Sequence, residues 1–193
     1  MSKIRMFFLT IYQWFAVQYA KNGMLGGYVH DTAMAQYIPP NTFHCVTGTW
    51  TDIAGQVAGT ICRHKAATAE TSIVNIPITI VSNSVALKGA LLKSVEVDYE
   101  IQVAACTSVT GAIVKVVRGA DLAVAVVSAP ACTQDLVAAV GAASVEQHKL
   151  TVSLTVPAWI DQDEIYFLKL TIVAAATSTV DLLAAVANFT ERI

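Results

Sequence analysis

The stretch LLKSVEVDYEIQVAA, residues 91–105, is the clearest structural signal in the sequence. Apolar residues alternate in it with acidic and amide residues. Because a strand places successive side chains on opposite faces, this pattern predicts a long strand with one dry and one wet face. The dry face is β-branched and aromatic, which suits a half-buried sheet. Its apolar set is Val95, Val97, Tyr99, Ile101 and Val103, and its polar set is Glu96, Asp98, Glu100 and Gln102.

Further segments with strand character surround this one. Residues 71–81 are almost entirely β-branched, and Pro77 among them predicts an edge position or a bulge. Residues 148–156 alternate, with Leu150, Val152, Leu154 and Val156 expected to point inward, and residues 164–174 and 179–190 are also predicted strands. About eight short strands separated by turn residues predict an all-β fold. We expect an antiparallel β-sandwich or jelly-roll-like domain over residues 41–193.

Residues 1–40 are expected to form a separate N-terminal arm or helix, with Pro39-Pro40 as its boundary. Its apolar run is too short for a membrane span. Two other interpretations remain: residues 1–20 as a secretory signal peptide, or translation starting at Met34. Large apolar residues recur at helical spacing, which predicts an apolar stripe that needs a partner. The expected interface residues are Phe7, Phe8, Ile11, Trp14 and Phe15.

Composition indicates a surface of low charge. Charged residues make up 13% of the 193 residues and hydrophobic residues 55%, with a net charge of −2. Ordinary soluble domains carry about 25% charged residues. A weakly charged surface suits a subunit packed against neighbours. The sequence has no basic patch of the kind that nucleic acid requires, so no direct nucleic-acid partner is expected.

The four cysteines are widely spaced and form no CxxC pair. Two disulfides would be possible in an oxidising compartment, but we expect free, buried thiols in a chain assembled in a cytoplasm. His44-Cys45 and Cys62-Arg63-His64 could supply zinc ligands if their strands pair. The spacing fits no zinc finger or ribbon, so core cysteines and surface histidines are favoured over a zinc site.

No catalytic motif is found in the sequence: GxSxG, HExxH and phosphate-binding loops are all absent. Neither a catalytic residue nor a cofactor is therefore expected. The weak candidates for a cation site are the loop carboxylates Asp161, Asp163 and Glu164. The three acids of the central strand could in principle do acid–base chemistry, although solvation of a sheet face explains them better. Trp50, Trp159 and Tyr166 could form a sugar-binding platform or could be core residues.

Three stretches resemble uncharacterised β-rich virion proteins of tailed phages and environmental viruses. They begin GTWTDIAGQVAG at residue 48, SVALKGALLKSVEVDYEI at residue 84 and HKLTVSLTVPAWIDQDEI at residue 148. The shared features are strands rich in Ala, Thr and Val, a Lys-Gly step before the long strand, and a strand ended by proline. The resemblance covers residues 46–193 and implies a capsid, decoration, collar or tail protein. It carries over no functional residue.

These observations predict a non-enzymatic structural subunit of a virus particle, assembled in the host cytoplasm. Its expected partners are copies of itself and other virion proteins. The alternative is a secreted or cell-surface binding module, for example for carbohydrate, with residues 1–20 as its signal peptide.

Overall fold

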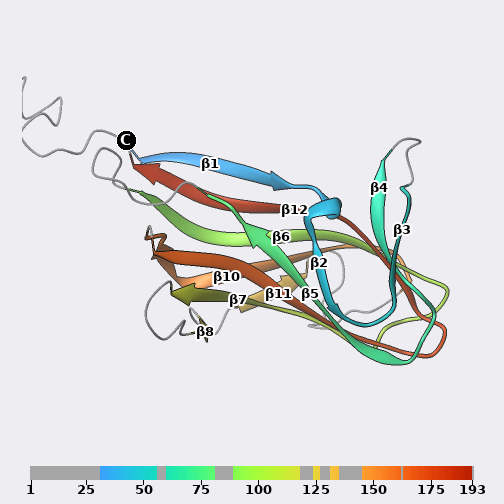
Figure 1. The fold of residues 1–193 in the computed structure, drawn as a ribbon. Coiled ribbons are helices and arrows are strands. Elements are labelled where there is room, and N and C mark those ends of the chain that lie inside the picture. Colours follow the sequence, from blue (N-terminus) through green and yellow to red (C-terminus); the bar gives the residue numbers. More distant parts are fainter. Residues whose placement is uncertain are drawn as a thin grey trace, which may run out of the picture.

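The computed structural model describes residues 31–55, 60–80, 89–117, 124–126, 131–134, 145–161 and 163–192. In this part of the chain, two antiparallel sheets form a β-sandwich (Figure 1). The predicted all-β class and sandwich architecture are confirmed. The strands, with one 3-10 turn η1 (Pro40–Thr42), are β1 (Asp31–Ile38), β2 (His44–Thr47), β3 (Trp50–Ala54), β4 (Ile61–Lys65), β5 (Glu70–Ile78), β6 (Ala90–Gln102), β7 (Ser108–Val117), β8 (Val124–Val126), β9 (Ala131–Gln134), β10 (Gln147–Trp159), β11 (Glu164–Ala174) and β12 (Thr179–Arg192).

The larger sheet, called sheet A here, has the order β3-β4-β12-β6-β10-β9, and β1 also pairs with β12. The smaller sheet, sheet B, has the order β2-β5-β11-β7-β8. In Figure 1 the strands β5 and β11 of sheet B lie in front of β6 and β10 of sheet A. All pairings are antiparallel, so each strand can turn one face to the core and one to solvent.

The central stretch forms β6 in the predicted register. Val97, Tyr99 and Ile101 are fully buried in the core, while Glu96 and Glu100 lie half-buried on the opposite face. Val103 departs from the prediction, because β6 ends at Gln102 and Val103 is 75% exposed in a left-handed conformation (φ 70°). The alternation therefore predicts the strand but overestimates its length.

Strand β10 also follows its alternation and then departs from it. Leu150, Val152 and Leu154 are buried, but Val156, which was expected to point inward, is 71% exposed. The pairing of β10 with β6 is interrupted between Ser153 and Ala158. This irregularity releases Val156 from the core, because a change of register alters which face a side chain occupies.

Gly111 lies inside β7, although the sequence of residues 106–111 predicts a hairpin connection. It is buried, and a Cβ at this position would meet Val152 Cγ2 at 2.6 Å and Leu168 Cδ1 at 3.2 Å. Val152 belongs to sheet A, whereas Gly111 belongs to sheet B. The missing side chain therefore lets the two sheets approach each other closely.

The sequence FHCVTGTWT predicts one short strand over residues 43–51, but these residues divide between the two sheets. Gly48, at φ 97°, separates β2 in sheet B from β3 in sheet A. Beside this crossing, the fully buried Lys65 donates hydrogen bonds to the carbonyls of Ala66 (2.7 Å) and Thr68 (2.8 Å). Its Nζ also lies 3.4 Å from Glu70 Oε1. The buried ammonium is thus surrounded by oxygen atoms.

Candidate functional site

The candidate site is a groove at a break in one edge of sheet A. On this edge β12 changes partner: β4 pairs with Val180–Leu182, and β1 pairs with the segment from Ala185 onward. Neither β1 nor β4 pairs with Leu183 or Ala184 of β12. The space between the end of β1 and the start of β4 therefore opens onto these two residues.

A β-bulge shapes the floor of this groove. On the other edge of β12, Leu182 pairs with Tyr99 and Ala184 with Asp98, so Leu183 is an extra residue without a partner on β6. A bulge of this kind bends the strand and re-aims its side chains. Leu183 and Ala184 are half-exposed, although Leu182 beside them is fully buried. The extra residue thus supplies apolar surface to the groove.

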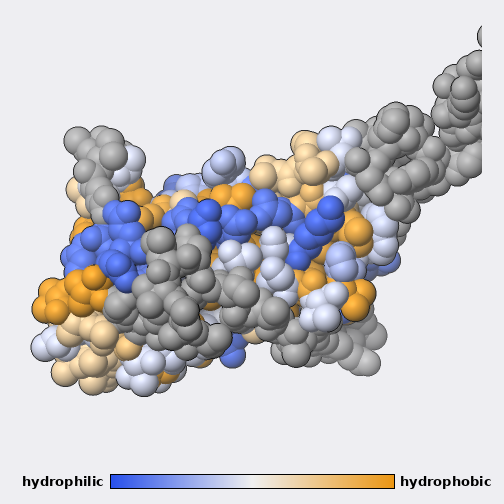
Figure 2. Space-filling view, turned by 180° about the vertical axis from the view of Figure 1, so that it is seen from behind, coloured by the Kyte–Doolittle hydropathy of each residue, from blue (hydrophilic) through white to orange (hydrophobic). Residues whose placement is uncertain are grey.

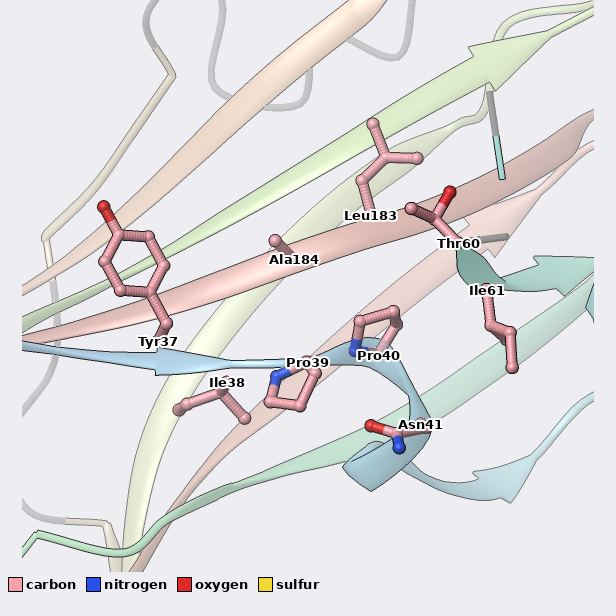
Figure 3. Close-up of a pocket in the computed structure, with 9 residues that line it drawn as sticks. All are labelled: Tyr37, Ile38, Pro39, Pro40, Asn41, Thr60, Ile61, Leu183 and Ala184. Carbon is pink, nitrogen blue, oxygen red and sulfur yellow. The ribbon is translucent and has the colours of Figure 1, made fainter. Parts of the chain in front are cut away.

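The walls come from three further segments, which Figure 3 shows around β12. The end of β1 and the turn η1 form one wall, and the start of β4 forms the other. The cavity has a volume of about 610 Å³. It is lined by Tyr37, Ile38, Pro39, Pro40, Asn41, Thr60, Ile61, Leu183 and Ala184.

Apolar side chains dominate this lining. Tyr37 is 79% exposed and Ile61 is 50% exposed, so both offer surface to a partner. The polar side-chain groups of the lining are the Tyr37 hydroxyl, the Asn41 amide and the Thr60 hydroxyl. The described residues of the lining include no carboxylate, imidazole, amine, guanidinium or thiol, and their surface is mainly apolar.

Arg63 fixes the turn that forms one wall. Its guanidinium donates to the carbonyls of Pro40 (3.2 Å) and Asn41 (3.3 Å) and also pairs with Asp52. The Thr42 hydroxyl donates to the Pro39 carbonyl at 2.7 Å. These bonds hold the proline turn against β4, so this wall is formed before any partner binds.

A polar strip lies next to the groove on the outer face of sheet A. The register places Glu100 opposite Asp181, and the Asp181 carboxylate contacts His64 Nδ1 at 2.5 Å. Further along β6, Glu96 accepts a hydrogen bond from Asn188 (3.0 Å) and lies 3.3 Å from Lys149 Nζ. Figure 2 shows a hydrophilic band along this side of the molecule. The acids form a network that solvates the sheet face.

The two possible zinc-ligand pairs lie in different sheets. His44 and Cys45 belong to β2 in sheet B, whereas Cys62 and His64 belong to β4 in sheet A. Cys45 and Cys62 are free thiols, and burial raises the pKa of both. Cys106 is also a free, buried thiol. In the described part of the chain, no three His, Cys, Asp or Glu residues gather as a metal site would require.

The three loop carboxylates lie in different surroundings. Glu164 starts β11 and accepts hydrogen bonds from Lys115 and from the Tyr166 hydroxyl (2.6 Å). Burial alone would raise the pKa of Glu164, but these bonds outweigh it and hold that pKa below its usual range. Its backbone N–H donates to the Asp161 carbonyl at 3.1 Å, which closes the turn. Asp163 is exposed between them.

The three aromatic residues considered for a sugar platform do not form one. Tyr166 is a core residue, 2% exposed, and its hydroxyl, which donates to Glu164, also lies 3.3 Å from the Trp159 carbonyl oxygen. Trp159 pairs with Leu91 at the start of β6. Trp50 pairs with Lys65 of β4, and this part of β4 is joined through β12 to the end of β6. These rings therefore lie at opposite ends of the sandwich.

The expected interface residues Phe7, Phe8, Ile11, Trp14 and Phe15 lie outside the described residues. Asp31–Ile38, which the sequence analysis assigns to the N-terminal segment, forms β1 of sheet A. The groove has no counterpart among the sequence-based predictions, because Pro39-Pro40 is typical of a boundary and the bulge at Leu183 has no sequence signature. Among the described residues, no helix is long and apolar enough to span a membrane.

Neither a protein-family model nor a curated protein matches this chain. Among solved structures, it is similar to the CBM22-1 xylan-binding domain of Paenibacillus barcinonensis Xyn10C. The sequences are 13% identical, and the match covers 83% of this chain and 97% of that domain, with a TM-score of 0.41.

Proposed function

We propose that the protein is a non-enzymatic structural subunit that acts by self-association, with the groove as a contact surface. The observation that carries this proposal is the open apolar groove with an uncharged lining. Tyr37 and Ile61 stand in its walls with most or half of their surface exposed. Burying one such side chain is worth about 1.5–3 kcal/mol, so a partner that covers both would gain substantially.

The chain itself contains a segment that suits this groove. Its first 20 residues hold the apolar and aromatic side chains predicted to need a partner. Deep in the groove, Leu183 and Ala184 leave room for such side chains. In the proposed assembly, the apolar arm of one subunit binds in the apolar groove of another. The resemblance to virion proteins further suggests that the assembly is a virus particle formed in the host cytoplasm, in which the subunit is a capsid, decoration, collar or tail component.

Sedimentation velocity of groove variants tests self-association. The full chain should sediment as an oligomer, and the pair of changes Tyr37→Ser and Ile61→Ser should weaken association at least tenfold. Val156→Ser is the matched control, because Val156 is 71% exposed but lies outside the groove. A full chain that stays monomeric at high concentration would refute the proposal. If the groove changes and the control change weaken association equally, the groove is not the contact surface.

Deletion of residues 2–30 tests the arm. The deletion stops there because Asp31–Ile38 is a strand of sheet A. The truncated chain should keep the β-sheet signal in circular dichroism and sediment as a smaller species than the full chain. Full assembly of the truncated chain would show that the arm does not join the subunits.

One observation favours a second candidate, a carbohydrate-binding module. The exposed Tyr37 ring lies near the polar strip of sheet A, since Tyr37 pairs with Val186 and Val186 with Glu96. An aromatic ring beside hydrogen-bonding groups is an arrangement that can hold a sugar. Retarded migration in gels that contain soluble polysaccharides, abolished by Tyr37→Ser, would support this candidate. Intact mass of the native protein would show whether a signal peptide has been removed.

A further inference from the structure

Strand β1 is the outermost strand on its side of sheet A (Figure 1). It pairs with β12 through eight consecutive residues without a register shift. Within the described part of the chain, no strand pairs with its other edge. One full row of strand edge is therefore available to a further strand.

This edge lacks the usual protection against pairing. Natural sheets shield their edges with charged side chains, prolines, bulges or short strands. Residues 32–37, TAMAQY, contain no charge and no proline, and their pairing with β12 has no bulge. By contrast, β2 has four residues and a register shift against β5, and β3 has five residues and carries Asp52. Of these edges, β1 is the one shaped for pairing.

The side chains of β1 also suit an additional strand. Ala33 and Ala35 are exposed and small, Met34 is 43% exposed, and Tyr37 is 79% exposed. Gln36 is anchored by hydrogen bonds with Thr79, the residue that follows β5, and these bonds fix the end of β1 in place. Over residues 32–37 the edge is thus uncharged, regular and held in position.

We propose that β1 pairs antiparallel with β1 of a second copy, so that the two larger sheets join across a two-fold axis. This inference rests on the proposed function and identifies the first contact of the assembly. Residues opposite each other in an antiparallel pair share a face. The outer face of one sheet A then continues into the outer face of the other.

The side chains are compatible with a register centred on Ala35. With Ala35 opposite Ala35 at the axis, the large Tyr37 lies opposite the small Ala33 of the second copy. Met34 then lies opposite Gln36, and Thr32 opposite Ile38. A shift by two residues toward the N-terminus would instead put Tyr37 opposite Asp31, a poorer match.

This pairing also explains how the arm reaches a groove. Within one chain, Asp31 is separated from the groove at Ile38 by seven residues of β1, about 23 Å at 3.3 Å per residue. In the pair, Asp31 of the second copy comes next to Pro39 of the first, at the groove wall. The start of the described chain in one copy is then next to the groove of the other.

Cysteine cross-linking tests the register. Opposite side chains of an antiparallel pair have Cβ atoms about 4.5–5.5 Å apart, close enough for a disulfide after small adjustments. Ala35→Cys should therefore form a covalent dimer under copper phenanthroline in non-reducing gels. Two copies of Ala33→Cys should not, since their Cβ atoms would be about four residues, or 13 Å, apart. The unaltered chain, which has its own cysteines, gives the background.

A mixture of the Ala33→Cys and Tyr37→Cys variants should give a cross-linked heterodimer. The Ala35→Lys change should weaken dimerisation at least tenfold, because two ammonium groups would meet at the axis. If the full chain self-associates but Ala35→Cys does not cross-link, or Ala33→Cys cross-links more readily, edge pairing is wrong and the proposed function stands. If the full chain is monomeric, the proposed function fails and this inference fails with it.

Discussion

Replacing Gly111 with alanine tests how closely the two sheets approach. The new Cβ would lie 2.6 Å from Val152 Cγ2 and 3.4 Å from Leu150 Cδ2. Both of these side chains are fully buried and belong to sheet A. The β-branched Val152 has little freedom to move aside. Overpacking of this kind costs about 1–3 kcal/mol. Alanine also lowers the conformational entropy of the unfolded chain relative to glycine, which stabilises the fold by about 0.4–1 kcal/mol.

The net loss in the free energy of unfolding should therefore be about 1–2 kcal/mol. Urea unfolding followed by circular dichroism measures it as a lower midpoint, by about 0.5–1 M for a slope of about 2 kcal/mol/M. Ala112→Gly is the matched control: it changes the same backbone preference at the next, half-exposed position of β7. It should cost about 0.5–1 kcal/mol.

The double variant with Val152→Ala completes the test. Removing the two Val152 methyl groups should relieve the clash, so the effects of the two changes should fall short of their sum by more than 0.5 kcal/mol, roughly the limit for independent sites. Simple additivity would show that Gly111 and Val152 do not touch. The reasoning about sheet spacing would then be refuted, whatever the size of the single effects.

Three further changes test other parts of the structure. Ile101→Ala, at a fully buried position of β6, should lower the free energy of unfolding by about 2–5 kcal/mol in urea titrations, and a loss below 1 kcal/mol would contradict its place in the core. Lys65→Met should cost about 1–3 kcal/mol by thermal unfolding, because it leaves the carbonyls of Ala66 and Thr68 without their donor; unchanged stability would show that the buried ammonium is not needed. The Thr49 N–H, at 2.7 Å, lowers the pKa of Glu70 below its usual 4.5, so this group stabilises the fold above pH 4.5 and its contribution is lost as the pH falls through the lowered value. The stability advantage of the unaltered chain over Glu70→Gln should therefore shrink from pH 6 to pH 3, and a difference independent of pH would contradict the assignment.

The sequence could predict the sandwich because period-two alternation marks a half-buried strand. β6 and most of β10 follow it, with Val97 and Val152 in the core. The failures occur where backbone geometry overrides the pattern. Gly48 splits one expected strand between the sheets, and the register shift before Ala158 exposes Val156. Nothing in the identities of these residues announces such local changes.

The groove was still harder to predict, because its parts are distant in the chain. The proline pair was visible as a boundary, yet its role as a wall depends on Arg63, more than twenty residues later. The extra residue Leu183 gains its position only when β12 pairs with β6. A site made by a break in strand pairing exists only once the pairing is known.

The position of β12 has a consequence for the order of folding. It is the last strand of the described chain, yet it lies between β6 on one edge and both β1 and β4 on the other. During synthesis, β1 and β4 must wait for their partner until almost all the other strands have left the ribosome. Contacts so distant in sequence close slowly. The nascent chain therefore holds an unfinished sheet for most of its synthesis, and the edge of β1, uncharged over residues 32–37, is exposed to premature pairing during that interval.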